Sequence, residues 1–324
     1  MLAARYERGG PASEVLLVEE IDRPEPGPGD VLVGVRVSGV NPTDFKARAA
    51  GLPEGAAFQV PNQDGAGVIE AVGAGVDPAR VGERVWLYFA AWQRRWGTAA
   101  QWTVVPADQA VPLPDNASDD LGASLGIPAL TAHRCLLADG PIEGGTVLVA
   151  GGAGAVGHAA IELARWAGAR VVATVSTPDK AELARAAGAD AVIDYRAADA
   201  AERVREAAPD GVDRVVELAL ARNLELDLAA CAPHASIVSY AREGGDPQVP
   251  ARTLMFANLN LRFVLVYTIP RDALAGAVRD VGAALRAGAL TTLPLHRFAL
   301  ERTADAHDAV ERGAVGKVVI DIPA

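Results

Sequence analysis

The pattern of hydrophobic and polar positions changes at about residue 118. Before that point, short hydrophobic runs rich in β-branched residues are separated by Pro and Gly clusters such as residues 24–29. This pattern is typical of strands joined by turns and predicts an all-β barrel. The expected strands are Glu14–Val18, Val31–Val37, Gly67–Val72, Arg84–Leu87 and Gln101–Val105.

From about Ser118 onward, hydrophobic strands alternate with alanine-rich segments of helical period. This alternation predicts a doubly wound parallel sheet with helices between its strands. The expected strands are Val147–Ala150, Arg170–Val175, Ala191–Tyr195, Arg214–Leu218, Ala235–Tyr240 and Leu261–Tyr267, followed by a closing strand at Lys317–Ile322. The clearest helices are Val156–Ala167, Pro178–Ala187 and residues 270–287.

Length and charge narrow the class of protein. A chain of 324 residues favours two domains, or one domain interrupted by another. Its net charge of −11 disfavours sequence-independent electrostatic binding to nucleic acid or to an anionic membrane. No hydrophobic run reaches the ~18 residues of a membrane span, and the first residues do not resemble a secretion signal. We therefore expect a soluble cytoplasmic protein that binds neither nucleic acid nor membrane.

The strand Val147–Ala150 leads directly into a glycine-rich turn and then into a helix. Gly151, Gly154 and Gly157 allow a tight turn, a close approach of a pyrophosphate to the backbone, and close packing of the helix on the strand. The free N–H groups of the helix N-terminus would bind phosphate oxygens. Because strand, turn and helix occur in this order, the sequence predicts a dinucleotide site.

The end of the second strand of this unit indicates which dinucleotide binds. NAD-binding sites carry an acidic residue there, which holds the ribose hydroxyls. Here the strand ends at Val175 and is followed by Ser176, with Lys180 four residues later. A hydroxyl and an ammonium group can both donate to a 2′-phosphate, which a carboxylate would repel. The sequence therefore predicts NADPH as the cofactor.

Six ordered motifs resemble those of the zinc-free, zeta-crystallin-like quinone oxidoreductases of the medium-chain dehydrogenase/reductase superfamily. Besides the glycine turn, they are residues 39–44 (GVNPTD), 63–73 (QDGAGVIEAVG), 81–85 (VGERV), 127–132 (IPALTA) and 316–319 (GKVV). The resemblance implies an α/β fold with two domains. One is a GroES-like barrel over residues 1–122, completed by 271–324, and the other is a Rossmann domain over 123–270.

The resemblance also implies a reaction without a metal ion. Zinc-dependent relatives have a cysteine where this chain has Asn41 and a His-Glu pair where it has Gln63 and Asp64. The chain has only two cysteines, Cys135 and Cys231, so it has no site of four thiolates. Hydride transfer without a metal requires an electron-poor acceptor. A quinone or an α,β-unsaturated carbonyl meets this requirement, whereas an ordinary alcohol does not.

Residue roles follow from the same resemblance. It places Asn41 and Thr131 beside the nicotinamide, Lys180 and Tyr195 beside the adenosine 2′-phosphate, and Lys317 near the same cofactor. Gly154, Ala155 and Val156 would supply backbone contacts to the pyrophosphate. Lys46 stands in a sequence that resembles enone and alkenal reductases, and it could polarise the acceptor carbonyl. Asn41, Lys46 and Thr131 are thus the candidate catalytic residues, although Lys46 also fits an exposed helix cation.

Several functions remain open. The first is an NADPH-dependent reductase of quinones. The alternatives are a reductase of the C=C bond of enones, alkenals or enoyl thioesters, and a non-catalytic NADPH-binding protein. The long hydrophobic strand at Leu261–Tyr267 is expected at a sheet edge and predicts a homodimer, unless its own chain covers it. An aromatic cluster over residues 86–102 fits either a barrel core or a wall for a flat substrate.

Overall fold

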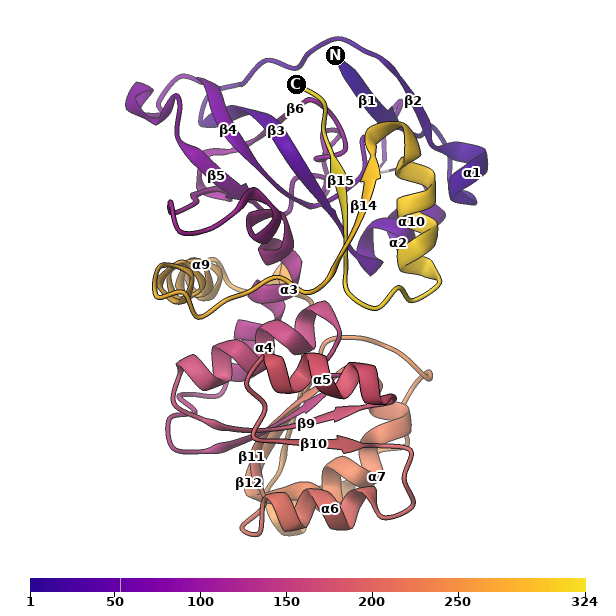
Figure 1. The fold of residues 1–324 in the computed structure, drawn as a ribbon, viewed down its shortest axis with the longest axis vertical. Coiled ribbons are helices and arrows are strands. Elements are labelled where there is room, and N and C mark those ends of the chain that lie inside the picture. Colours follow the sequence, from indigo (N-terminus) through magenta and orange to yellow (C-terminus); the bar gives the residue numbers. More distant parts are fainter. Residues whose placement is uncertain (53) are drawn as a thin grey trace. The chain divides into compact units, whose positions relative to one another are not determined.

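A computed structural model describes residues 1–52 and 54–324. The chain divides into two compact units, which Figure 1 shows as ribbons. Unit 1 consists of Met1–Ile127 together with Thr292–Ala324, and unit 2 consists of Pro128–Thr291. The N-terminal segment therefore joins the C-terminal segment in one unit, and the middle of the chain forms the other.

Unit 1 is built around a seven-stranded, mostly antiparallel sheet. Its strand order is β14-β15-β3-β4-β5-β7, and β6 also pairs with β3. A separate hairpin is formed by β1 (Leu2–Arg5) and β2 (Leu17–Glu20). The sheet strands are β3 (Asp30–Val40), β4 (Asp64–Val72), β5 (Arg84–Leu87), β6 (Trp102–Pro106), β7 (Ala110–Pro112), β14 (Leu295–Ala299) and β15 (Lys317–Asp321). The helices are α1 (Ala12–Val15), α2 (Pro42–Ala50) and α10 (Thr303–Glu311).

The core of unit 1 is formed by alternating inward-facing residues of these strands, among them Val31, Val33, Ile69 and Val85. Three members of the aromatic cluster, Trp86, Tyr88 and Phe89, are at most 3% exposed. These three side chains therefore pack in the core of unit 1.

Unit 2 is a six-stranded parallel sheet in the order β10-β9-β8-β11-β12-β13. Numbered within the unit, this is the 3-2-1-4-5-6 order of dinucleotide-binding folds, with its reversal point between β8 and β11. The strands are β8 (Thr146–Ala150), β9 (Arg170–Val175), β10 (Ala191–Asp194), β11 (Val212–Glu217), β12 (Cys231–Ser239) and β13 (Asn260–Phe263). The structure confirms the predicted fold class, a barrel unit combined with a Rossmann unit.

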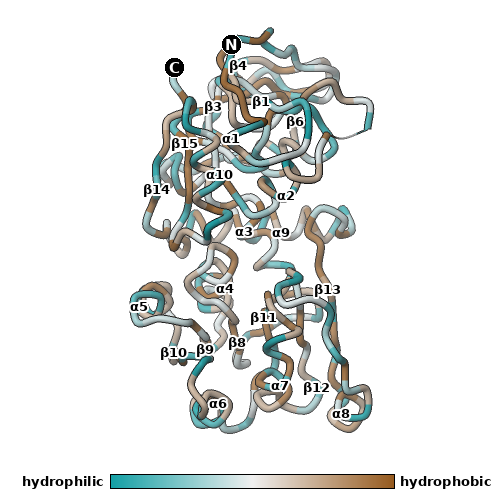
Figure 2. The backbone as a smooth tube through the Cα atoms, turned by 90° about the vertical axis from the view of Figure 1, so that its right-hand side faces the viewer, coloured by the Kyte–Doolittle hydropathy of each residue, from teal (hydrophilic) through white to brown (hydrophobic). Residues whose placement is uncertain are grey.

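Helices cover both faces of this sheet. In Figure 1, α4 (Ala155–Trp166) and α5 (Pro178–Ala186) lie on one side, and α6 (Ala200–Ala207) and α7 (Leu220–Ala230) lie on the other. Hydrophobic residues, brown in Figure 2, run along the strands between them. Two further helices complete unit 2, α8 (Ala251–Ala257) and α9 (Arg271–Arg286).

The units divide at residues 127/128 and 291/292, later in the chain than the expected boundaries at 122/123 and 270/271. The first division falls inside α3 (Asp119–Leu137), a helix that contains Pro128. At the second division, α9 belongs to unit 2 because it packs against α4 and because Asp280 lies 2.8 Å from His133 Nε2. Thr291 is also held there, since its N–H donates to the Glu162 carboxylate at 3.1 Å.

Two predicted strands differ from the structure. The strand expected at Glu14–Val18 starts only at Leu17, because Glu14 and Val15 belong to the helical turn α1 after Pro11. Strand β13 ends at Phe263 rather than at Tyr267, and a 3-10 turn follows at Val266–Thr268. Of the helices in residues 1–52 and 54–324, none combines the length and the hydrophobicity needed to cross a membrane.

Candidate functional site

The glycine turn after β8 leads into the N-terminus of α4 in unit 2. Gly151 has a φ of 68°, and a Cβ at Gly157 would lie 2.3 Å from the Gly151 carbonyl oxygen. Both positions therefore require glycine. Gly154 is the exposed N-cap of α4, so the N–H groups of Ala155 and Val156 lie in the first helical turn and have no partner within the helix. This arrangement can bind an anion through backbone N–H groups and the helix dipole.

Three further predicted residues gather at the carboxyl ends of the neighbouring strands. Lys180, in the first turn of α5, donates from Nζ to the Ser176 hydroxyl at 3.2 Å. Tyr195 follows β10, and its N–H donates to the carbonyl of Val175, the last residue of β9. Its side chain is 43% exposed and free to contact a ligand. The turn is continuous with this group, because the Gly152 N–H donates to the Thr174 carbonyl on β9.

A second polar cluster lies in unit 1, where the ends of β3, β4 and β15 meet. Lys317 Nζ donates to Asn41 Oδ1 at 2.7 Å and to the Val40 carbonyl at 3.3 Å. The other end of the same amide, Asn41 Nδ2, donates to Asp64 Oδ2 at 2.7 Å. Asn41, Asp64 and Lys317 are each at most 2% exposed. Both ends of the Asn41 amide are therefore fixed, and the ammonium of Lys317 is held inside unit 1.

Asp44 joins this cluster from helix α2. Its two oxygens accept the N–H groups of Asn41 at 2.7 Å and of Gln63 at 3.1 Å. Burial raises the pKa of Asp44, and the negative charge of Asp64 raises it further. Burial also raises the pKa of Asp64, to about 6, although the charge of Lys317 opposes the shift. The pKa of Lys317 is lowered by burial.

The sequence analysis did not single out Asp44 or Asp64 as members of a charged cluster. A signal for Asp44 exists, because Asn41-Pro42 followed by an acid at the third helical position is a helix-start pattern. No comparable local signal marks Asp64 or its link to Lys317, because these residues are far apart in the chain.

The two remaining candidate catalytic residues lie in different units. Lys46 is an exposed residue of α2 in unit 1, and its Nζ is 6.0 Å from the centre of the Phe45 ring. Thr131 is a residue of α3 in unit 2 and is 5% exposed. The structure thus brings together Ser176, Lys180 and Tyr195 in unit 2, and Asn41 and Lys317 in unit 1.

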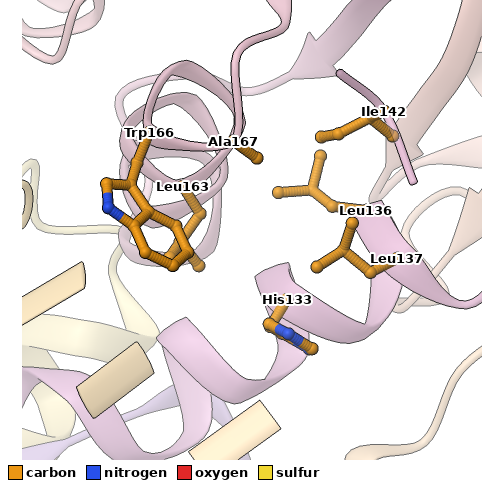
Figure 3. A pocket seen from close by; sticks show the side chains of 7 residues that line it. All are labelled: His133, Leu136, Leu137, Ile142, Leu163, Trp166 and Ala167. Carbon is orange, nitrogen blue, oxygen red and sulfur yellow. The ribbon is translucent and has the colours of Figure 1, made fainter. Parts of the chain in front are cut away.

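A hydrophobic hollow in unit 2 does not fit a dinucleotide. Its cavity volume is about 10 Å³, and it lies at the carboxyl end of α4, whereas the glycine turn precedes the other end of that helix. Binding sites for small organic ligands usually span about 300–1,000 Å³. Figure 3 shows the side chains that line it, which are His133, Leu136, Leu137, Ile142, Leu163, Trp166 and Ala167.

The residues at the family's metal-ligand positions do not fit a metal ion. The Asn41 amide is already bonded at both ends, and Asp64 also accepts the Ile127 N–H at 2.9 Å. The ammonium of Lys317, 2.7 Å from Asn41 Oδ1, would repel a cation there. In the part of the chain that the structure describes, no three His, Cys, Asp or Glu side chains are grouped to hold a metal.

Two family models match the chain, one in each unit. Residues 27–115 match the alcohol dehydrogenase GroES-like domain, and residues 155–281 match the zinc-binding dehydrogenase family. The second description names zinc, whereas the family's ligand positions in this chain are occupied by Asn41, Gln63 and Asp64.

Individual proteins are similar over nearly the whole length. Human quinone oxidoreductase is 28% identical over 321 residues, covering 97% of this chain and 95% of the human protein. A mycobacterial quinone oxidoreductase structure is 31% identical, with a TM-score of 0.87, and covers 99% of both chains. A mycobacterial structure in complex with NADPH is also 31% identical, with a TM-score of 0.85, and covers 99% of this chain and 100% of that chain.

Proposed function

Because the chain belongs to the medium-chain dehydrogenase/reductase superfamily and is an oxidoreductase of the quinone oxidoreductase type, we propose that it transfers hydride from NADPH to a quinone. The cofactor would bind at the glycine turn of unit 2. Its pyrophosphate would meet the N–H groups of Ala155 and Val156, where a helix N-terminus favours negative charge. Gly151, Gly154 and Gly157 would allow the pyrophosphate to approach the backbone closely.

The observation that carries the cofactor assignment is the pair formed by Lys180 and Ser176. The ammonium and the hydroxyl lie 3.2 Å apart at the end of β9, a strand that ends without a carboxylate. Both groups can donate hydrogen bonds to a 2′-phosphate, and Tyr195 lies beside them. The relative solved with NADPH supports the same assignment.

The reaction would need no metal ion, because a quinone is already electron-poor. Hydride from the bound cofactor and a proton from water would convert the quinone to a hydroquinone and leave the oxidised cofactor. The protein would hold the cofactor and the acceptor in position and would polarise the acceptor oxygen. We assign this role to Asn41 and Thr131 near the nicotinamide and to Lys46 near the acceptor oxygen, with Lys317 fixing the orientation of the Asn41 amide.

Reduction of the C=C bond of an enone, an alkenal or an enoyl thioester is the second candidate. The exposed ammonium of Lys46 favours it, because a cation near the carbonyl oxygen would stabilise the enolate that forms when hydride reaches the β-carbon. The glycine turn would bind NADPH equally well in a protein without turnover, so binding of the cofactor does not by itself test the reaction.

Single-turnover mixing separates a reductase from a binding protein. Protein in excess over NADPH is mixed with a simple quinone, and we expect loss of the reduced cofactor with one hydroquinone formed per NADPH consumed. Tight binding of NADPH that persists unchanged after addition of quinones and enones would refute the reductase and leave the non-catalytic alternative.

Activity is expected to survive removal of metal ions, because the amide of Asn41 is already bonded at one end to Asp64 and at the other to Lys317. The measurement is the turnover rate before and after extensive dialysis against a chelator. Zinc present in equal amount to the protein, and lost together with activity, would contradict this expectation.

We also propose a homodimer formed at the edge strand β13. Figure 2 shows the hydrophobic segment through β13, where Phe263 is 65% exposed and Leu265 is 54% exposed. Helix α8, directly before this strand, exposes 75% of Met255 and 78% of Phe256. Such an edge, beside exposed hydrophobic side chains, favours pairing with a second copy across a two-fold axis.

Light scattering tests the dimer. We expect a dilute species of about twice the 33.5 kDa chain mass, and a shift towards the single-chain mass in Phe263→Glu. A species near 33.5 kDa for the unaltered protein would rule out the dimer.

A further inference from the structure

The turn after β11 packs directly on the glycine turn. Strands β8 and β11 are neighbours at the point where the strand order of unit 2 reverses. Ligands of open α/β sheets bind outside the carboxyl ends of the strands at this point. A Cβ added to Gly151, after β8, would lie 2.7 Å from Leu218 Cδ2, after β11. The position of Leu218 is therefore coupled to the shape of the glycine turn.

Glu217, the last residue of β11, holds this turn in place. Its side chain is fully buried, and its carboxyl accepts the N–H of Ala219 and a hydrogen bond from Asn223 Nδ2 at 3.0 Å. Its backbone carbonyl accepts the Tyr240 N–H at 3.0 Å. Ala219 is the N-cap of α7, so the negative charge of Glu217 also lies at the positive end of a helix.

Asp227 approaches Glu217 from the same helix, one turn after Asn223. It is 1% exposed, and within the described chain neither of its oxygens accepts a hydrogen bond from an N–H group or a hydroxyl. Its carboxyl lies close to that of Glu217, and burial together with this proximity raises the pKa of Asp227. A buried carboxylate with no donor is strongly unfavourable, and two carboxyl groups can bond to each other only through a proton. The contact therefore requires a proton between the two side chains.

We propose that Asp227 carries this proton and donates it to Glu217, and that the shared proton holds the Leu218–Ala219 turn against the glycine turn. Glu217 and Asp227 would then be positioning residues for the cofactor. This role rests on the proposed binding of NADPH at the glycine turn, whereas the shared proton itself does not.

The groups around the pair favour retention of the proton. Burial raises the pKa of Glu217 and the charge of nearby Glu243 adds to the shift, although the hydrogen bonds from Ala219 and Asn223 oppose it. Burial and the proximity of Glu217 raise the pKa of Asp227 well above its usual range. Cys231 and Tyr240 also face the pair, and burial raises the pKa of both, so they remain neutral. Loss of the proton would leave Glu217 and Asp227 charged beside Glu243.

The first experiment tests the shared proton without the cofactor. An unfolded carboxyl group loses its proton near pH 4, whereas the native pair would keep one, so stability due to the pair falls as pH rises above about 4. The unfolding constant of the unaltered protein, divided by that of Asp227→Asn, should therefore rise about tenfold per pH unit until the native pair loses its proton. The amide introduced by this substitution would still donate a hydrogen bond to Glu217 but would not titrate.

Glu225→Gln is the matched control, because Glu225 is an exposed acid on the same helix. The unfolding constant of the unaltered protein, divided by that of Glu225→Gln, should stay constant from about pH 6 to 8. A constant ratio for Asp227→Asn over that interval would overturn the shared proton.

The second experiment tests the positioning role by the affinity for NADPH between about pH 7 and 10. In this interval the 2′-phosphate is largely ionised, and its remaining titration is the same for both proteins, so it cancels in their comparison. We expect the affinity of the unaltered protein to fall at least tenfold as the pair loses its proton. Over the same pH interval, the logarithm of the affinity of Asp227→Asn for NADPH should change by less than half as much as that of the unaltered protein.

The two experiments separate this inference from the proposed function. If NADPH binds and both proteins lose affinity in parallel, the positioning role is overturned while the cofactor assignment stands. If NADPH does not bind at any pH, the cofactor assignment fails together with the positioning role. A pH-dependent stability ratio would still support the shared proton in that case.

Discussion

Replacing Lys46 by Met is expected to lower the rate of enone reduction by about 10²–10³, the usual cost of removing one donor to a developing oxyanion. Lys46 is exposed on α2, the helix that begins directly after the buried, Asp64-bonded Asn41. Its ammonium would stabilise the enolate more than the enone, so its loss would lower turnover with little change in the binding of NADPH. Quinones are easily reduced and should lose less activity.

Parallel kinetics with one enone and one quinone test this role. Arg48 is not a suitable control because it is buried, whereas Lys46→Arg keeps the cation and should retain most of the activity. Equal losses on both acceptors, or no loss on either, would show that Lys46 does not polarise the acceptor carbonyl.

Replacing Lys180 by Ala is expected to weaken NADPH binding about 10- to 100-fold and to leave NADH binding nearly unchanged. A hydrogen bond to a charged group contributes about 1.5–3 kcal/mol, which corresponds to that range of affinity. NADH has no 2′-phosphate, so it would make no contact with the ammonium. Equilibrium titration of both cofactors measures the difference.

Arg185→Ala provides the matched control on helix α5. Arg185 is 53% exposed in its side chain and pairs with Glu182, away from Ser176. Loss of its charge should affect neither cofactor by more than a small factor. Equal weakening of NADPH and NADH by Lys180→Ala would contradict the assignment of the 2′-phosphate site.

The Rossmann unit could be predicted from sequence because its local signals agree with its tertiary structure. Strand β9 occupies the predicted residues Arg170–Val175, since a run of β-branched residues ends at the helix start Thr177-Pro178. Thr177 is the N-cap there and accepts the Lys180 N–H, as its residue type suggests. The group formed by Ser176, Lys180 and Tyr195 follows from this regularity, because the ends of parallel strands meet at one edge.

Helix α3 could not be predicted in the same way, because its sequence contains residues that usually interrupt helices. Gly126 is required inside it, since a Cβ there would lie 2.1 Å from Asp64 Oδ1. Pro128 follows two residues later within the same helix. The close approach to Asp64 overrides helix propensity, and this constraint is visible only when the strand that carries Asp64 is in place.

The buried charges were also beyond local sequence reasoning. Lys317 and Asn41 are separated by most of the chain, yet their side chains are 2.7 Å apart. Glu217 and Asp227 are closer in sequence, but a pattern of acids alone does not show that helix α7 turns Asp227 towards the end of β11. In both clusters, burial shifts the pKa of the side chains, and burial depends on the complete fold.

We propose that this chain uses NADPH to reduce an electron-poor carbonyl compound without a metal. The most direct measurement compares the initial rates of NADPH and NADH oxidation by chelator-treated protein, with one quinone and one enone as acceptors. The account predicts oxidation that requires an acceptor and is at least tenfold more efficient with NADPH than with NADH. Oxidation that requires added zinc, that proceeds equally with both cofactors, or that is absent with every acceptor would contradict it.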